Sequence, residues 1–164
     1  MSNKPQVLVV MGSRSDLPCM EKTIEMLKEF KISYEVRAIS AHRTPQAVLK
    51  MAEQAKDNGV KVIIAGAGGA AHLAGVIASS TTLPVIGVPI QTSALGGMDS
   101  LLSIVQMPGG IPVATTAIGN AGAKNAGILA AQMIALYDDE MAQRVAEFKQ
   151  TQAESVLRNA HIDI

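Results

Sequence analysis

Gln6-Val7-Leu8-Val9-Val10-Met11 is a short, almost wholly apolar run that Gly12 ends, and this run decides the fold class. Apolar residues at helical spacing follow over 17–30, so the two segments predict a strand and then a helix. A strand without polar alternation is buried on both of its faces, which is typical of a parallel sheet covered by helices. The stretch therefore predicts an α/β fold.

The same alternation of strand and helix recurs along the rest of the chain. Further strands are expected at 34–39, 60–65, 84–88 and 111–115, and helices at 45–56, 70–79, 99–105 and 123–136. Alternating elements of this kind build a parallel sheet covered on both faces, and its ligands bind beyond the carboxyl ends of the strands. A last amphipathic helix, at 138–159, is expected to pack either on its own domain or on a neighbouring subunit.

Length and composition limit the classes of protein to which the chain can belong. We expect one domain over residues 1–164, and the 14 basic residues balance the 14 acidic ones. No net charge and only 2% aromatic residues make the chain a poor nucleic-acid binder. The lone Cys19 and the lack of a signal-peptide pattern favour a reducing cytoplasm. The longest uncharged run, 62–82, contains several glycines and His72, which argues against a membrane span.

The loop after the second expected strand holds the most reactive residues. It reads Ser40-Ala41-His42-Arg43-Thr44-Pro45, where Pro45 suits the first helical position and Thr44 suits the N-cap. A helix start favours an anion, and Arg43 can hold a phosphate with two hydrogen bonds. His42 can take and give a proton near neutral pH. A loop histidine taken alone is more often an ordinary surface residue, but the adjoining arginine favours chemistry.

A second loop, Gly12-Ser13-Arg14-Ser15-Asp16, follows the first strand and should meet the histidine loop at one cleft. Ser13 and Ser15 offer hydroxyl groups, and Gly12 lets a ligand approach the backbone. Asp16 can accept hydrogen bonds from sugar hydroxyls. The competing interpretation is that Ser15 or Asp16 only caps the helix that follows.

A third loop, 66–72, also falls at the carboxyl end of a strand. Its Gly66-x-Gly68-x-x-Ala71 pattern matches the dinucleotide-binding fingerprint, but no acidic residue stands about 20 positions later to hold a ribose. A backbone nest for a carboxylate or phosphate and simple close packing are both consistent with these residues. His72 is expected at a helix start, lining or supporting the pocket.

The segment 93–110 is rich in glycine and serine. It predicts either a mobile lid or a glycine-assisted turn into a buried helix. The sequence contains neither a metal-ligand pattern of the usual kind nor a G-x-S-x-G nucleophile elbow.

Several motifs occur in the order in which one known family has them. They are Gly12-Ser-x-Ser-Asp16, Ser40-Ala-His-Arg-Thr-Pro45, Ala65-Gly-Ala-Gly-Gly-Ala-Ala-His-Leu73, Gly87-Val-Pro89 and Asp99-Ser-Leu-x-Ser-Ile-Val-Gln-Met-Pro108. On these motifs the chain resembles the 5-(carboxyamino)imidazole ribonucleotide mutase family of purine biosynthesis. The resemblance implies a flavodoxin-like three-layer αβα sandwich and a homo-octamer whose carboxyl-terminal helices pack on neighbours. It also implies a ribonucleotide substrate and no metal, nucleotide or organic cofactor.

The resemblance further implies roles for individual residues. His42 would be the general acid/base, Arg43 and two serines would hold the ribose phosphate, and Asp16 would hold the ribose hydroxyls. Ala67 and Gly68 would hold the migrating carboxylate. The full set of expected substrate contacts is Gly12, Ser13, Asp16, Ser40, Arg43, Ala67, Gly68 and His72.

Three other functions compete with the mutase. The first is a carboxylase that takes aminoimidazole ribonucleotide and carbon dioxide directly, which the motifs separate poorly from the mutase. The second is a non-catalytic ribonucleotide-binding protein, against which the adjoining His42 argues. An oxidoreductase that uses a dinucleotide ranks last, because the acidic ribose partner is missing.

Overall fold

A central parallel sheet organises the chain in the computed structural model, which describes residues 4–162. Its strands are β1 (Val7–Met11), β2 (Tyr34–Ala38), β3 (Val62–Ala67), β4 (Val85–Pro89) and β5 (Ala114–Thr115). All of the paired strands are parallel, in the order β2-β1-β3-β4-β5. This is the strand order of flavodoxin-like folds, so the predicted fold class is confirmed.

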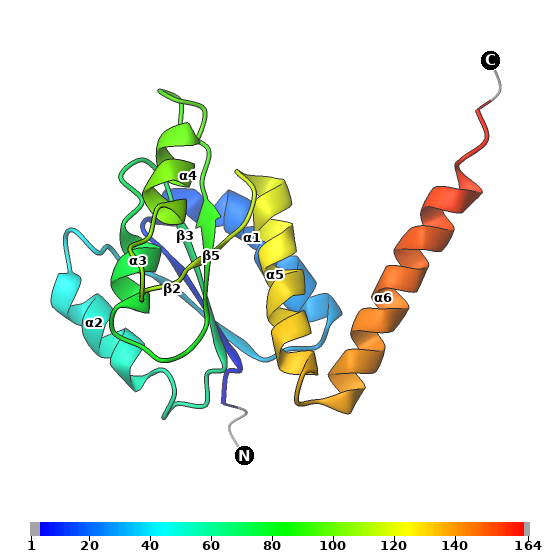
Figure 1. The fold of residues 1–164 in the computed structure, drawn as a ribbon, viewed down its shortest axis with the longest axis horizontal. Helices are drawn as coiled ribbons and strands as arrows, with labels where there is room; N and C mark the ends of the chain where they lie inside the picture. Colours follow the sequence, from blue (N-terminus) through cyan, green and yellow to red (C-terminus); the bar gives the residue numbers. More distant parts are fainter. Residues whose placement is uncertain (1–3, 163–164) are drawn as a thin grey trace.

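Helices cover both faces of the sheet (Figure 1). They are α1 (Leu17–Glu29), α2 (Pro45–Gln54), α3 (Leu73–Ala78), α4 (Met98–Val105), α5 (Asn120–Ala135) and α6 (Asp139–Arg158), with a 3-10 turn η1 (Arg14–Asp16) before α1. Successive residues of β1 alternate between two cores: Val9 packs with α1 and α5, whereas Val10 packs with α2, α3 and α4. This alternation makes β1 buried on both sides, as its apolar run predicted.

The bounds of the elements differ from the sequence prediction mainly at three places. Helix α3 begins at Leu73 instead of residue 70, because Gly69 adopts a φ of 69° and its carbonyl accepts the amide of Ala71 in a tight turn. Helix α5 begins three residues early, at Asn120, directly after Gly119 with a φ of 75°. Strand β5 pairs over only two residues, although 111–115 was expected.

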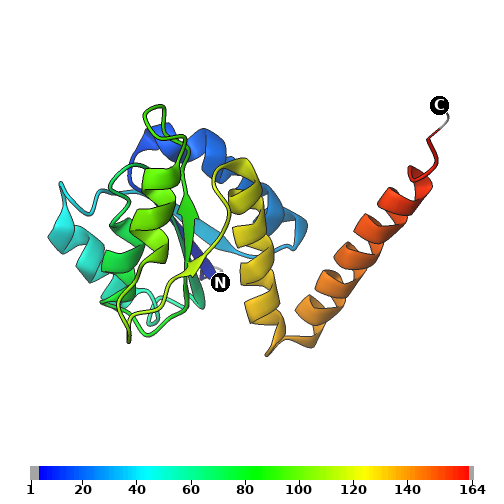
Figure 2. The same cartoon turned by 45° about the horizontal axis from the view of Figure 1, so that its top comes forward.

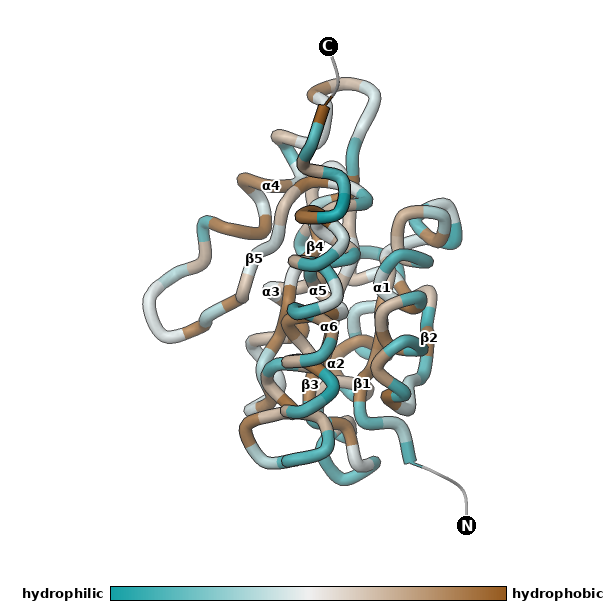
Figure 3. Tube along the Cα trace, turned by 90° about the vertical axis from the view of Figure 1, so that its right-hand side faces the viewer, coloured by the Kyte–Doolittle hydropathy of each residue, from teal (hydrophilic) through white to brown (hydrophobic). Residues whose placement is uncertain are grey.

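Helix α6 leaves the body of the domain at an angle (Figures 1 and 2). Its first half packs on the domain: Met141 is buried, Arg144 donates to the carbonyl of Phe30 at 2.9 Å, and the ring of Phe148 meets that of Phe30 edge-on. Its second half projects, and Leu157 is 73% exposed. Figure 3 shows that this helix is largely hydrophilic, with hydrophobic residues at intervals along it. No helix within residues 4–162 is long and apolar enough to cross a bilayer.

Candidate active site

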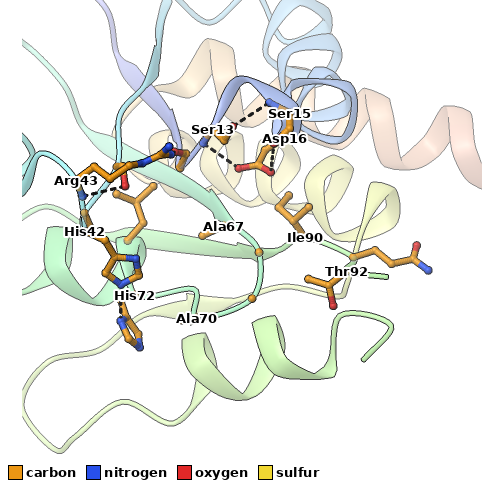
Figure 4. A pocket seen from close by; sticks show the side chains of 17 residues that line it. Ser13, Ser15, Asp16, His42, Arg43, Ala67, Ala70, His72, Ile90 and Thr92 are labelled. Carbon is orange, nitrogen blue, oxygen red and sulfur yellow. Dashed lines mark hydrogen bonds between the residues drawn. The ribbon is translucent and has the colours of Figure 1, made fainter. Parts of the chain in front are cut away.

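An open cleft with a volume of about 610 Å³ lies at the carboxyl ends of β1 to β4 (Figure 4). It spans the gap between the loops after β1 and β3, the switch point at which sheets of this order bind ligands. Every residue that the sequence predicted for the site lines the cleft: Gly12, Ser13, Asp16, Ser40, His42, Arg43, Ala67, Gly68 and His72. Three loops that are far apart in the sequence therefore meet as expected.

The loop after β1 is folded back on itself by Ser13 and Asp16. The amide of Ser13 donates to the Asp16 carboxylate at 3.1 Å, and the amide of Ser15 donates to the Ser13 hydroxyl at 3.3 Å. These bonds belong to η1, and Asp16 makes no side-chain bond into α1. The interpretation that Ser15 or Asp16 only caps α1 is therefore wrong, because the carboxylate turns back to the loop and lines the cleft.

Burial raises the pKa of the Asp16 carboxyl above its ordinary value, and this effect exceeds the opposing hydrogen bonds from Ser13 and Ser15. Desolvation disfavours the charged form of a carboxyl group, whereas hydrogen-bond donors favour it. The carboxylate keeps lone pairs that the loop does not use, so it can accept donors from a ligand in the cleft.

Ser40 organises the loop after β2. Its hydroxyl accepts the amide of Arg43 at 3.2 Å, and its carbonyl accepts the amide and the hydroxyl of Thr44, each at 2.9 Å. Thr44 occupies the N-cap position of α2 and Pro45 follows it, as predicted. The Thr44 hydroxyl, however, caps no helical amide, because it donates backwards to Ser40.

Arg43 bridges two of the loops. One nitrogen of its guanidinium donates to the carbonyl of Gly12 at 3.4 Å, which leaves other donors of the planar group for a ligand. Arg43 is also the only lysine or arginine among the described residues that line the cleft. A planar cation at the start of α2 is suited to a phosphate.

His42 and His72 form a direct hydrogen bond that sequence reasoning missed. His42 Nε2 lies 2.8 Å from His72 Nδ1, and the two rings are nearly perpendicular, at 86° (Figure 4). One of the two nitrogens must donate and the other must accept, so the bond fixes the orientation of both rings. His72 occupies the N-cap position of α3, as expected for a helix-start residue.

The loop after β3 offers backbone groups in place of reactive side chains. Within residues 4–162, the amides of Gly68 and Ala70 have no acceptor, and both residues line the cleft. The first glycine of the apparent dinucleotide fingerprint serves packing, since a Cβ at Gly66 would lie 2.4 Å from the Met20 sulfur. The loop thus presents two free amides to the cleft, which suit a carboxylate or a phosphate.

The far wall of the cleft comes from Ile90, Gln91 and Thr92, after β4, which the sequence prediction did not include. The signal was available, because β4 ends at the same edge of the sheet as the other strands. The residues that the structure describes contain no group of three or more His, Cys, Asp or Glu side chains that could hold a metal ion.

The glycine- and serine-rich segment 93–110 is a turn followed by α4. Gly97, with a φ of 95°, precedes the helix, and a Cβ there would lie 2.5 Å from Ile118. This agrees with a glycine-assisted turn into a helix. The helix is buried on one side only: Ser100 and Ile104 are fully buried, whereas Leu102 is 51% exposed.

Comparison with known proteins decides the family. The sequence model of the AIR carboxylase family matches residues 6–155. The chain belongs to this family. It is 54% identical to the N5-carboxyaminoimidazole ribonucleotide mutase of Bacillus subtilis over 96% of this chain and 97% of the relative. It is 58% identical to the protein of the same name from Aliivibrio fischeri, over 94% of this chain and 96% of the relative.

A solved structure has the same fold. The crystal structure of Treponema denticola PurE superposes with a TM-score of 0.85 at 31% identity, covering 94% of this chain and 96% of that one. The fold and the family that the sequence motifs predicted are therefore confirmed.

Proposed function

We propose that this protein is an isomerase that converts 5-(carboxyamino)imidazole ribonucleotide into 4-carboxy-5-aminoimidazole ribonucleotide in the synthesis of IMP. The names of its relatives at 52–58% identity support this substrate. The observation that carries the proposal is the bonded His42–His72 pair, which shares one cleft with Arg43 and with the free amides of the loop after β3.

The nucleotide end of the substrate would bind to the first two loops. Arg43, Ser13 and Ser40 would hold the phosphate, next to the start of α2, where the helix dipole favours an anion. Gly12 lets the ligand approach the backbone, and the Asp16 carboxylate would accept the ribose hydroxyls. Both serine hydroxyls accept amides within their own loops, so their protons are free to be donated to phosphate oxygens. The phosphate is remote from the reacting atoms, so its binding energy positions the imidazole ring.

The reaction then needs one proton carrier. The bond between the exocyclic nitrogen and the carboxylate breaks, releasing carbon dioxide, and His42 gives a proton to that nitrogen. The electron-rich ring carbon attacks the carbon dioxide and forms the new carbon–carbon bond. His42 takes the proton from the tetrahedral ring carbon, which restores the aromatic ring and the starting protonation state.

The remaining residues would hold and shield the migrating group. Ala67 and Gly68 would contact the carboxylate, and the cleft would keep carbon dioxide from bulk water. His72 would orient the His42 ring through their 2.8 Å bond. A nucleotide held at both ends reacts in effect as a unimolecular system, which accounts for a large share of enzymatic rate enhancement.

Substrate preference separates the mutase from the carboxylase. Purified protein should turn over the N-carboxylated ribonucleotide rapidly and should turn over aminoimidazole ribonucleotide plus bicarbonate slowly, at equal nucleotide concentration. Faster turnover of the amine with bicarbonate would make the protein a carboxylase. Binding of the ribonucleotide without any change in its carboxylation would make it a non-catalytic binding protein.

We further propose that the whole chain is one domain, located in the cytoplasm, that assembles into a homo-octamer. Exposed apolar residues support an assembly, since Leu136 is 75%, Tyr137 is 90% and Val156 is 70% exposed. The projecting half of α6 would pack on a neighbouring subunit. Light scattering should give the mass of eight 17.1 kDa chains, and a monomer mass would overturn the assembly.

A further inference from the structure

Two polar side chains are fully buried in the part of the chain that the structure describes, and one of them lies behind the cleft. Ser100, on α4, donates its hydroxyl proton to the carbonyl of Ile90 at 2.7 Å and accepts the amide of Gly69 at 3.0 Å. A single buried hydroxyl thus joins α4, the end of β4 and the loop after β3. Buried groups of this kind hold their partners in one arrangement, because an unsatisfied polar atom is costly there.

The hydrogen bonds of Ser100 affect the orientation of the two free amides of the loop after β3, those of Gly68 and Ala70. A peptide unit is planar and trans, so its N–H and C=O point in opposite directions. The carbonyl of Ala67 accepts the amide of Ile90 at 2.9 Å, which fixes the unit that carries the Gly68 amide and turns that amide away from β4. Ser100 donates to the carbonyl of Ile90, so it anchors the residue whose amide orients the peptide unit of Gly68.

The Ala70 amide is set from the same helix. Its peptide unit includes the carbonyl of Gly69, which accepts the amide of Ala71 at 2.8 Å and also lies 3.3 Å from the Ser103 hydroxyl. That hydroxyl makes its shorter bond, 2.7 Å, to the carbonyl of Asp99 in the same helix. Gly69 has a φ of 69°, and Ser100 holds its amide. Both polar backbone groups of Gly69 therefore bond to α4, and the free Ala70 amide points away from that helix.

The start of α4 is itself tied down, so that Ser100 has a fixed place. The hydroxyl of Thr92 donates to the Asp99 carboxylate at 2.8 Å and accepts the amide of Gly97 at 3.3 Å. These bonds connect the turn before α4 with the loop after β4. They make α4 a rigid support for the cleft.

We propose that Ser100 is a positioning residue for carboxyl transfer: through Gly69 and Ile90 it aims the amides of Gly68 and Ala70 at the migrating carboxylate or carbon dioxide. This inference rests on the proposed mutase function. Ser100 does not line the cleft and acts only through its neighbours. Its loss should leave the phosphate end of the substrate unaffected and should weaken the hold on carbon dioxide.

The test is Ser100→Ala, with Thr23→Val as the matched control. Thr23 is the other fully buried polar residue, and its hydroxyl donates to the carbonyl of Ala123 at 2.7 Å, between α1 and α5 and off the cleft. Both variants lose a buried hydroxyl, so both should lower the thermal midpoint. Ser100→Ala alone should lower kcat by about 10- to 100-fold, the loss expected when reacting groups are misplaced by about 1 Å.

A labelled carboxyl group separates positioning from general destabilisation. With ¹³C-carboxylated substrate in unlabelled bicarbonate, Ser100→Ala should release more label to the medium per turnover, while KM stays within about twofold of the normal value. Wild-type kcat and label retention in Ser100→Ala would overturn the proposal, as would the same defects in Thr23→Val.

A second variant keeps the proposal testable if Ser100→Ala does not fold. Ser103→Ala removes the 3.3 Å bond to Gly69 together with the 2.7 Å bond to the Asp99 carbonyl, and it should release label in the same direction, to a smaller extent. Unchanged retention in a folded Ser103→Ala would then overturn the inference. If the unmodified protein fails to convert the carboxylated ribonucleotide at all, the proposed function fails. Normal turnover of the unmodified protein with unchanged serine variants refutes the role of Ser100 alone.

Discussion

The loops after β2 and β3 face the same cleft but contribute to it in opposite ways. The loop at 40–44 supplies the ionisable side chains of His42 and Arg43. The loop at 67–72 is made of alanine and glycine up to His72, and its polar groups are backbone amides. The comparison teaches that one loop works through residue identity and the other through backbone shape.

The two kinds of loop should therefore fail in different ways. A substitution in the loop after β2 removes a charge or a proton carrier and leaves the backbone in place. In the loop after β3, a substitution acts when it changes the direction of a peptide unit, even if no reactive atom is lost. The hydrogen bond between His42 and His72 connects the two loops. It is the exception to this distinction, because His72 lies in the loop after β3 but acts through its side chain.

The largest effect is expected for His42→Asn. This change should lower kcat by about 10²- to 10⁴-fold, the usual contribution of general acid–base catalysis, because asparagine cannot carry the proton. Ribonucleotide binding, measured by calorimetry, should persist, since the phosphate contacts lie on other residues. Near-normal turnover would remove His42 from the mechanism.

Arg43→Ala comes next and should act on binding. Charge-assisted hydrogen bonds contribute about 1.5–3 kcal/mol each, so KM should rise by roughly 10- to 100-fold. Arg14→Ala is the control, because Arg14 lies in the neighbouring loop but does not line the cleft. Equal effects of the two variants would show that only the general positive charge of this surface matters.

Gly69→Ala tests the backbone loop alone. A Cβ at Gly69 would meet no protein atom within 4 Å, so within the protein the change adds only the strain of a φ of 69°. Left-handed backbone costs a non-glycine residue about 1–2 kcal/mol, and relaxation of the loop should lower kcat by about tenfold.

Gly96→Ala is a control matched in strain. Gly96 also has open space around it and a φ of 64°, but it does not line the cleft. Thermal melting should show similar destabilisation in both variants, with normal turnover in Gly96→Ala only. Normal turnover in Gly69→Ala would refute a role for backbone shape in that loop.

His72→Phe should have a smaller effect, on kcat and not on KM. It removes the 2.8 Å bond that orients His42, and a net hydrogen bond of about 1 kcal/mol corresponds to about a fivefold loss of rate. Steady-state kinetics would measure both constants. A KM that rises while kcat stays normal would assign His72 to substrate binding instead.

The smallest effect concerns Asp16 and acid pH. Burial raises the pKa of this carboxyl above 3.8, so on acidification Asp16 takes up its proton earlier than an ordinary aspartate. KM should rise by about twofold as the pH falls through this range, since the neutral group is a weaker acceptor for ribose hydroxyls.

The raised pKa of Asp16 also makes the stability of the protein depend on pH. The folded protein binds this proton more tightly than the unfolded chain, so the contribution of Asp16 to the free energy of unfolding falls as the pH rises through the range just above 3.8. Asp16→Asn should abolish that dependence in thermal melts and should flatten the profile of KM against pH. A wild-type profile in Asp16→Asn would exclude this carboxyl as the cause.

Local patterns in the sequence predicted most of the fold and much of the site. The apolar run at 6–11 and the helical spacing after it identified the layers. The motifs in the loops at strand ends, through the family that they resemble, identified nine lining residues. Hydrogen-bond partners were harder to predict, because a polar side chain near a helix start has a choice of them. Asp16 and Thr44 both stand where caps are expected, and both bond backwards into their own loops.

The sequence by itself determined the α/β class, the position of His42 and Arg43 beside a helix start, and a glycine in the loop after β3. Periodicity and turn chemistry are local, so they can be recognised within a few residues. Only the tertiary structure decided which loops touch. The strand order β2-β1-β3-β4-β5 brings His42 against His72, 30 positions away, and Ser100 against Gly69, 31 positions away. Such pairs depend on how the sheet is wound, which no local pattern encodes.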